Sequence, residues 1–210
     1  MFFKKIFLVV LIIFLSQNIF AKDLNPDLDY YQKGINFYKN AEFDMAFSIF
    51  LELADKGDTD SQFNLTNMYS GGIGTTQDYT EALKWTWLCS LGGEKKCNKK
   101  IEKLIKKIDQ KTLEAVTKDI ENFLENKFSK TKEFIYALKL GFWHEKFSPE
   151  KNLEQAYIWY SVSVTGGLYK AMKIRNDVSE QLDAEVLIKL QSEANKIFSE
   201  TKSTNITSEK

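Results

Sequence analysis

Residues 63–85, which read FNLTNMYSGGIGTTQDYTEALKW, hold two helical patterns separated by a glycine-rich turn. Apolar side chains at helical spacing predict a first helix over about 59–69. The run 71–74, Gly-Gly-Ile-Gly, breaks that helix. Asp78 then caps a second helix, with Glu81 three residues later in the spacing of a capping box. The stretch therefore predicts a helical hairpin.

Helical patterns continue on both sides of this hairpin. Its second helix ends at Gly92-Gly93, and two more helices are predicted over about 95–107 and 109–127. Toward the N-terminus, a helix with a wide apolar face covers about 42–56, and Asn25-Pro26 opens the first helix. The mature chain therefore contains no segment that favours a β-strand.

The pattern repeats after residue 130. A shift of 74 residues overlays two halves without a gap, and a shorter shift of 36 relates the first pair of helices to the second. Self-similarity at such periods is typical of stacked helical hairpins, because one hairpin cannot bury its apolar face alone. The matches at a shift of 74 include Tyr69 with Trp143, Asp78 with Asn152, Ala82 with Ala156, Trp85 with Trp159, Gly92-Gly93 with Gly166-Gly167, and Leu113 with Leu187.

The predicted fold class is all-α, an α-solenoid of stacked helical hairpins. Pro is scarce, at 2 residues, and apolar residues make up 43% of the chain, which is ample for a core. The expected divisions are a hairpin over 22–58, a repeat with two further helices over 59–129, a second and degenerate unit with terminal helices over 130–200, and a disordered tail over 201–210.

The first 21 residues have the pattern of a secretory signal. Lys4 and Lys5 precede an apolar run over 6–15, and a small residue, Ala21, stands before a charged segment. The apolar run is shorter than the roughly 20 residues of a membrane span. We expect cleavage after Ala21 and no membrane span in the mature chain; an uncleaved anchor is the alternative.

Charge and residue types exclude several function classes. The chain has 29 basic and 29 acidic residues, and removal of 1–21 takes away two lysines, so nothing favours nucleic-acid binding. The single histidine, His144, has no nearby second ligand, and no cluster with zinc spacing exists, so we expect neither a metal nor a cofactor. The segment 129–131 is predicted to link the two halves.

The stretch 63–85 resembles the Sel1-like repeat, a relative of tetratricopeptide repeats. The resemblance lies in a leucine and an aromatic residue before a Gly-x-Gly turn, followed by an acidic residue, Ala and an aromatic residue. Thr66 stands where the family usually has Gly. Residues 140–159 keep the helix faces but replace the glycine turn with 145–149, and the hairpin over 30–57 is closer to a plain tetratricopeptide hairpin.

Two cysteines, Cys89 and Cys97, are separated by seven residues. In an exported chain, a lone pair favours a disulfide over a metal or redox site. The spacing also resembles the cysteine-rich branch of the Sel1-like family, which implies a bond between the second helix of one repeat and the first helix of the next. The alternative is two buried thiols that behave as small apolar residues.

Two features are candidates for binding. Lysines surround an apolar stripe on the helix over 95–107, and Lys99, Lys100 and Lys103 form either a solvated face or a docking patch for an anionic partner. Trp87 lies two residues after Trp85, so it points away from the face of Trp85. It is expected either to pack against the neighbouring hairpin or to join a binding surface on the concave face.

The sequence predicts an exported, non-enzymatic adaptor, periplasmic or secreted from a bacterium, that binds a protein or peptide on its concave face. The alternative function is a β-lactam-binding or β-lactamase-like protein acting on cell-wall material. It rests on Ser129-x-x-Lys132 and on what is described for cysteine-rich relatives. The Ser-Asp-Asn and Lys-Thr-Gly motifs that accompany such a serine are absent from the sequence.

Overall fold

The computed structural model describes residues 26–206, and side chains as far as Lys202. The described part is helical, with no strand, so the predicted all-α solenoid is confirmed. The signal sequence predicted over 1–21 lies outside the described residues. None of the described helices combines the length and the apolar character needed to cross a membrane.

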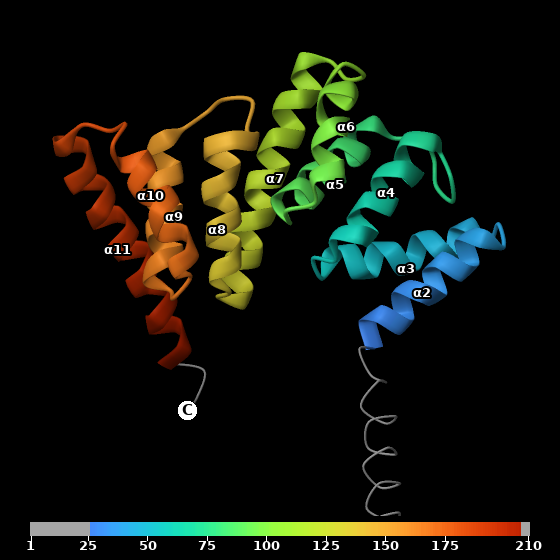
Figure 1. Cartoon of the computed structure of the whole chain (residues 1–210), viewed down its shortest axis with the longest axis horizontal. Coiled ribbons are helices and arrows are strands. Elements are labelled where there is room, and N and C mark those ends of the chain that lie inside the picture. Colours follow the sequence, from blue (N-terminus) through green and yellow to red (C-terminus); the bar gives the residue numbers. More distant parts are fainter. Residues whose placement is uncertain (1–25, 207–210) are drawn as a thin grey trace, which may run out of the picture.

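The helices follow one another along an arc (Figure 1). The first half of the chain contains α2 to α7, and each element packs mainly on its neighbours in the sequence. Their bounds are Pro26–Lys39 (α2), Phe43–Asp55 (α3), Thr59–Gly71 (α4), Tyr79–Leu91 (α5), Lys95–Ile105 (α6) and Gln110–Thr131 (α7).

The second half contains α8 to α11 and two short irregular helices. The element η1 is a π-helix that continues α8, and η2 is a 3-10 turn that precedes α10. Their bounds are Phe134–Phe142 (α8), Trp143–Phe147 (η1), Leu153–Thr165 (α9), Tyr169–Ala171 (η2), Met172–Ser179 (α10) and Ala184–Ile206 (α11).

The helices α5 and α9 are the centres of the two halves. Helix α5 packs against α4, α6 and α7, and α9 packs against α8, α10 and α11. Helices covered on several sides are apolar around most of their circumference. The caps agree with this equivalence, since the side chain of Asp78 accepts hydrogen bonds from the N–H groups of Thr80 and Glu81, and that of Asn152 accepts one from Gln155.

The structure corrects the repeat register at one helix. Helices α5 and α9 are related by 74 residues, as predicted, but α4 begins after Asp58 and α8 begins after Glu133, which is a shift of 75. The loop before α9 is correspondingly one residue shorter than the loop before α5. His144, rather than Trp143, therefore occupies the place of Tyr69.

Thr66 and Gly141 are equivalent at this register. In the first half, the hydroxyl groups of Thr66 and Thr86 lie 3.1 Å apart and are hydrogen-bonded. In the second half, a Cβ added to Gly141 would overlap the ring of Tyr160. The departure from the Sel1-like pattern at Thr66 is thus matched by a small partner, Thr86, where the second half has a tyrosine.

Two predictions about chain ends are wrong. The segment 129–131 is not a linker, because α7 continues to Thr131 and ends with Lys132 in the left-handed region at φ 58°. The tail predicted to be disordered from residue 201 instead begins as helix, since α11 continues to Ile206. Thr201 is buried at 6% exposure, so packing extends one turn further than the sequence pattern indicated.

Candidate functional site

The three lysines predicted as a patch divide into two environments on α6. Lys99 and Lys103 are exposed, and neither takes part in an ion pair within residues 26–202. Lys100 is half-buried, and its Nζ donates a hydrogen bond to Oδ1 of Asn67 at 2.7 Å. Burial, and then the charge of Lys103, lower the pKa of Lys100. Lys100 therefore holds α6 onto α4 instead of facing a partner.

Lys96 reinforces this attachment. Its Nζ donates to Oδ1 of Asp60 at 2.7 Å, and this hydrogen bond raises the pKa of Lys96. The ammonium groups of Lys96 and Lys100 lie 4.5 and 5.4 Å from the ring centroid of Phe63, within the range of cation–π attraction. The free positive surface of α6 is consequently narrower than the sequence indicated.

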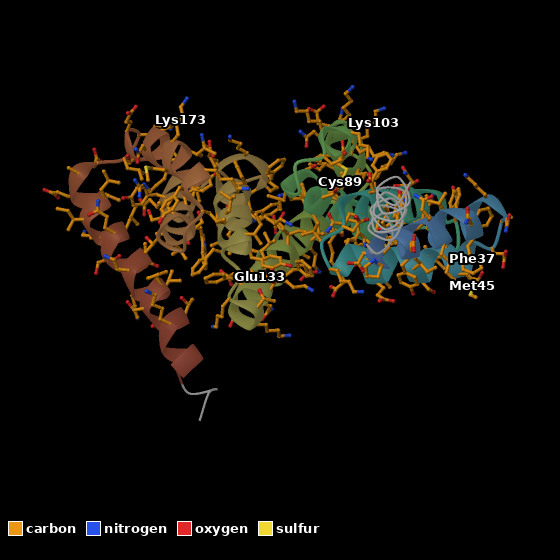
Figure 2. The ribbon with its side chains drawn as sticks, turned by 60° about the horizontal axis from the view of Figure 1, so that its bottom comes forward. Phe37, Met45, Cys89, Lys103, Glu133 and Lys173 are labelled. Carbon is orange, nitrogen blue, oxygen red and sulfur yellow. A yellow bond between two sulfur atoms is a disulfide. The ribbon has the colours of Figure 1, made fainter. Side chains whose placement is uncertain are left out.

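The predicted disulfide is confirmed. Cys89 on α5 and Cys97 on α6 are bonded, with their Cα atoms 6.1 Å apart, and both side chains are fully buried. The bond joins the two helices across the Gly92-Gly93 turn. It therefore fixes the helix that carries Lys99 and Lys103 (Figure 2).

The assignment of Trp87 to a binding surface is wrong. Trp87 is 0% exposed and packs edge-to-face on Trp143, with 5.1 Å between ring centroids. The reason is that α5 is covered by α4, α6 and α7, so the face opposite Trp85 is also inside the protein. The pair joins α5 to η1 and thus forms part of the core between the two halves.

A groove that the sequence did not indicate lies between the halves. It encloses about 440 Å³ and is bounded by the α3–α4 turn, the Gly92-Gly93 stop, α8 and the start of α10. Its apolar lining comes from residues that are distant in the sequence: Leu91, Ile135, Leu138, Phe142 and Ile174. Periodicity identifies these as packing residues, but only the fold shows that they meet at one surface.

Two lysines, Lys139 and Lys170, also line this groove. Burial lowers the pKa of Lys139, whose Nζ lies 5.6 Å from the ring centroid of Tyr136. Lys170 is exposed and makes no ion pair within the described residues. The groove therefore combines apolar contact area with positive charge.

No observation favours the β-lactam alternative. Ser129 is an exposed residue in the last turn of α7, and Lys132, the lysine of the motif, lies beyond the end of that helix. His144 is buried beside η1, 15 residues along the chain. Within residues 26–206, no group of three or more potential ligands is placed to hold a metal ion.

Comparison with known proteins gives a limited similarity. No protein-family model matches the chain. A curated protein, the exopolysaccharide production negative regulator of Rhizobium leguminosarum bv. viciae, is 39% identical to it over 64 residues. The matched stretch covers 30% of this chain and 24% of that protein. The similarity thus extends over about a quarter of the relative's length.

Proposed function

We propose that this protein is an exported member of the Sel1-like repeat family that acts as a regulator by binding a protein partner. The observation that carries the proposal is the groove between the halves, which brings together apolar side chains from α5, α8 and α10. Exposed apolar surface of this kind marks interaction sites. Concave or grooved surfaces formed by several repeats are where such proteins bind.

The lysines at the groove indicate the chemistry of the partner. Lys139 is partly desolvated, and Lys170 has no acidic partner within the described residues. A partner segment with apolar side chains next to a carboxylate would fill the groove and neutralise this charge. The exposed Lys99 and Lys103 on α6 would add attraction over a longer range.

Two further observations support export and regulation. The disulfide is typical of proteins in oxidising compartments such as the periplasm. The similar protein from Rhizobium is named as a negative regulator of exopolysaccharide production. A helical-repeat protein without a catalytic group regulates by occupying a surface of another protein, which agrees with a groove as the functional site.

The test is capture of partners from the native envelope by the purified mature protein. We expect a captured protein that is lost with Ile174→Glu and with Lys170→Glu. The matched controls are Ile188→Glu, at an exposed isoleucine on α11, and Lys173→Glu, which lies one turn after Lys170. Capture that both groove variants leave unchanged, with their folds intact by circular dichroism, would contradict the proposal.

A further inference from the structure

The helix junctions α3–α4 and α7–α8 are equivalent, yet one pair of residues differs completely in character. In the first half, the rings of Phe47 and Tyr69 pack edge-to-face with centroids 5.2 Å apart. The same places in the second half hold Glu121 and His144, whose Oε1 and Nε2 atoms are 3.4 Å apart. An aromatic contact has been replaced by a polar pair.

The register of the buried residues supports this equivalence. Helix α7 buries Ile120, Leu124 and Phe128, which follow Ala46, Phe50 and Ala54 of α3 by 74 residues. Phe47 therefore corresponds to Glu121. The equivalence of Tyr69 and His144 follows from the 75-residue shift between α4 and α8 described above.

His144 occupies an unusual environment. Its exposure is 6%, and its Nε2 has no hydrogen-bond partner in the described part of the chain, although Glu121 is near. Burial lowers the pKa of His144 to about 4, so the ring is neutral at pH 7. A neutral imidazole offers one donor and one acceptor. A buried polar group without a partner costs free energy, so its retention indicates a role.

A π-helix places this histidine. His144 is the second residue of η1, which spans Trp143–Phe147. Single π-turns that interrupt α-helices occur frequently at functional sites. The first half has no π-helix at the end of α4, where the chain instead turns through the glycine-rich loop.

His144 and Glu121 line a hollow of about 690 Å³ between α7, η1 and the start of α9. Its lining is dominated by side chains that both donate and accept hydrogen bonds: Gln110, Thr117, Ser148, Asn152 and Gln155. Three carboxylates and two ammonium groups nearly balance in charge: Glu114, Glu121, Glu150, Lys118 and Lys151. Apolar lining is confined to Leu113 and Pro149.

From this juxtaposition we propose that the hollow is a binding site for a neutral saccharide. The near-balance of charges disfavours polyanions and polycations, and the small apolar lining provides no pocket for an apolar side chain. Neighbouring hydroxyl groups of a sugar each need a donor and an acceptor, which the amides, hydroxyls and carboxylates supply. Leu113 and Pro149 suit the C–H face of a sugar ring.

The site is separate from the groove between the halves, since the two share no lining residue. Saccharide binding therefore does not depend on the proposed protein partner. The variant Ile174→Glu should bind saccharide as the unmodified protein does, so the two proposals succeed or fail independently.

The single histidine provides a direct reporter. His144 is the one histidine in the sequence, so the imidazole region of a long-range ¹H–¹⁵N spectrum of the mature protein contains the signals of one ring. The probes are chitotriose and cellotriose, which are neutral, with trigalacturonate and the glucosamine trimer as charged comparisons. We expect a neutral trimer to shift the His144 signals, and calorimetry to show weaker binding or none for both charged trimers.

The decisive variant rebuilds the first-half pair in the second half. Glu121→Phe with His144→Tyr should preserve packing, which circular dichroism and urea unfolding would verify, and should weaken saccharide binding about tenfold or more. Absence of any His144 shift with both neutral trimers would overturn the proposal. Undiminished affinity in the folded double variant, or preference for a charged trimer, would also overturn it.

Discussion

The two halves follow the same helical path but hold it together by different contacts. The first half has a disulfide between α5 and α6, two lysines on either side of Phe63, and a glycine turn in which a Cβ on Gly74 would overlap the backbone of Phe43. The second half has none of these equivalents in the described residues. It packs instead through Gly141 against Tyr160 and through η1.

The difference shows that a repeat conserves its path through caps and small residues, while its lateral contacts are free to change. Asp78 and Asn152 begin equivalent helices, although the pairs Thr66–Thr86 and Gly141–Tyr160 next to those helices share no side chain. The positions that changed together lie in contact. Substitutions that transfer one member of a pair between halves are therefore the most direct way to break the comparison.

The largest effect is expected for Gly141→Thr, which places the first-half residue in the second half. The threonine side chain would overlap the ring of Tyr160, which is 0% exposed and whose hydroxyl donates to Oε2 of Glu145 at 2.6 Å. We expect a loss of about 3 kcal/mol or more in the free energy of unfolding, measured by urea denaturation. Adding Tyr160→Thr should recover part of that loss, and a loss that the second substitution leaves unchanged would contradict the paired packing.

Removal of the disulfide should have the next largest effect. In the chain-entropy description, Cys89→Ser with Cys97→Ser should lower the free energy of unfolding by about 2–3 kcal/mol, because the unfolded chain is no longer constrained. A reducing agent should produce a similar shift in the unmodified protein and none in the variant. Ser163 and Ala171 occupy the equivalent places in the second half, so the first half gains a constraint that the second lacks. Equal stability of the oxidised and reduced forms would argue against that gain.

A smaller effect, confined to the second half, should appear with pH. The pKa of His144 is depressed to about 4 by burial, below its ordinary value of 6.5. The unfolded chain therefore binds a proton first as the pH falls, and the stability due to neutral His144 should decrease by about 2 kcal/mol between about pH 7 and 5. Glu125, whose pKa is raised by burial and then by Glu121, opposes this trend.

The variant with Glu121→Phe and His144→Tyr separates these contributions. Its unfolding free energy, followed by urea denaturation across the same pH range, should lack the decrease that His144 causes. A decrease of the same size in the variant would show that another group is responsible for the pH dependence.

The sequence was sufficient for the parts of the fold that depend on local chemistry. Asp78, Asn152 and the glycine pairs at 92–93 and 166–167 act on their own helix ends, so their roles can be predicted without tertiary structure. The ends of α7 and α11 were misjudged, because tertiary packing extends both helices beyond their periodic patterns.

The candidate sites were much less predictable. Trp87 was misassigned because its burial depends on three helices that surround α5, and a helical wheel represents one helix alone. The groove joins residues from 57 to 174, and the polar pair joins Glu121 to His144. A signal for the second pair did exist, since the 74-residue repeat aligns Glu121 with Phe47; the one-residue offset of α8 concealed its partner.

The disulfide spans only the turn between two consecutive helices, so it lies off the load path between the ends of the molecule. Under tension applied at the termini, every other part of the chain could extend, whereas the loop from Cys89 to Cys97 would stay closed. That closure would hide roughly 20 Å of contour length, a small part of the total. The bridge thus preserves the orientation of one helix and leaves the molecule as a whole free to stretch.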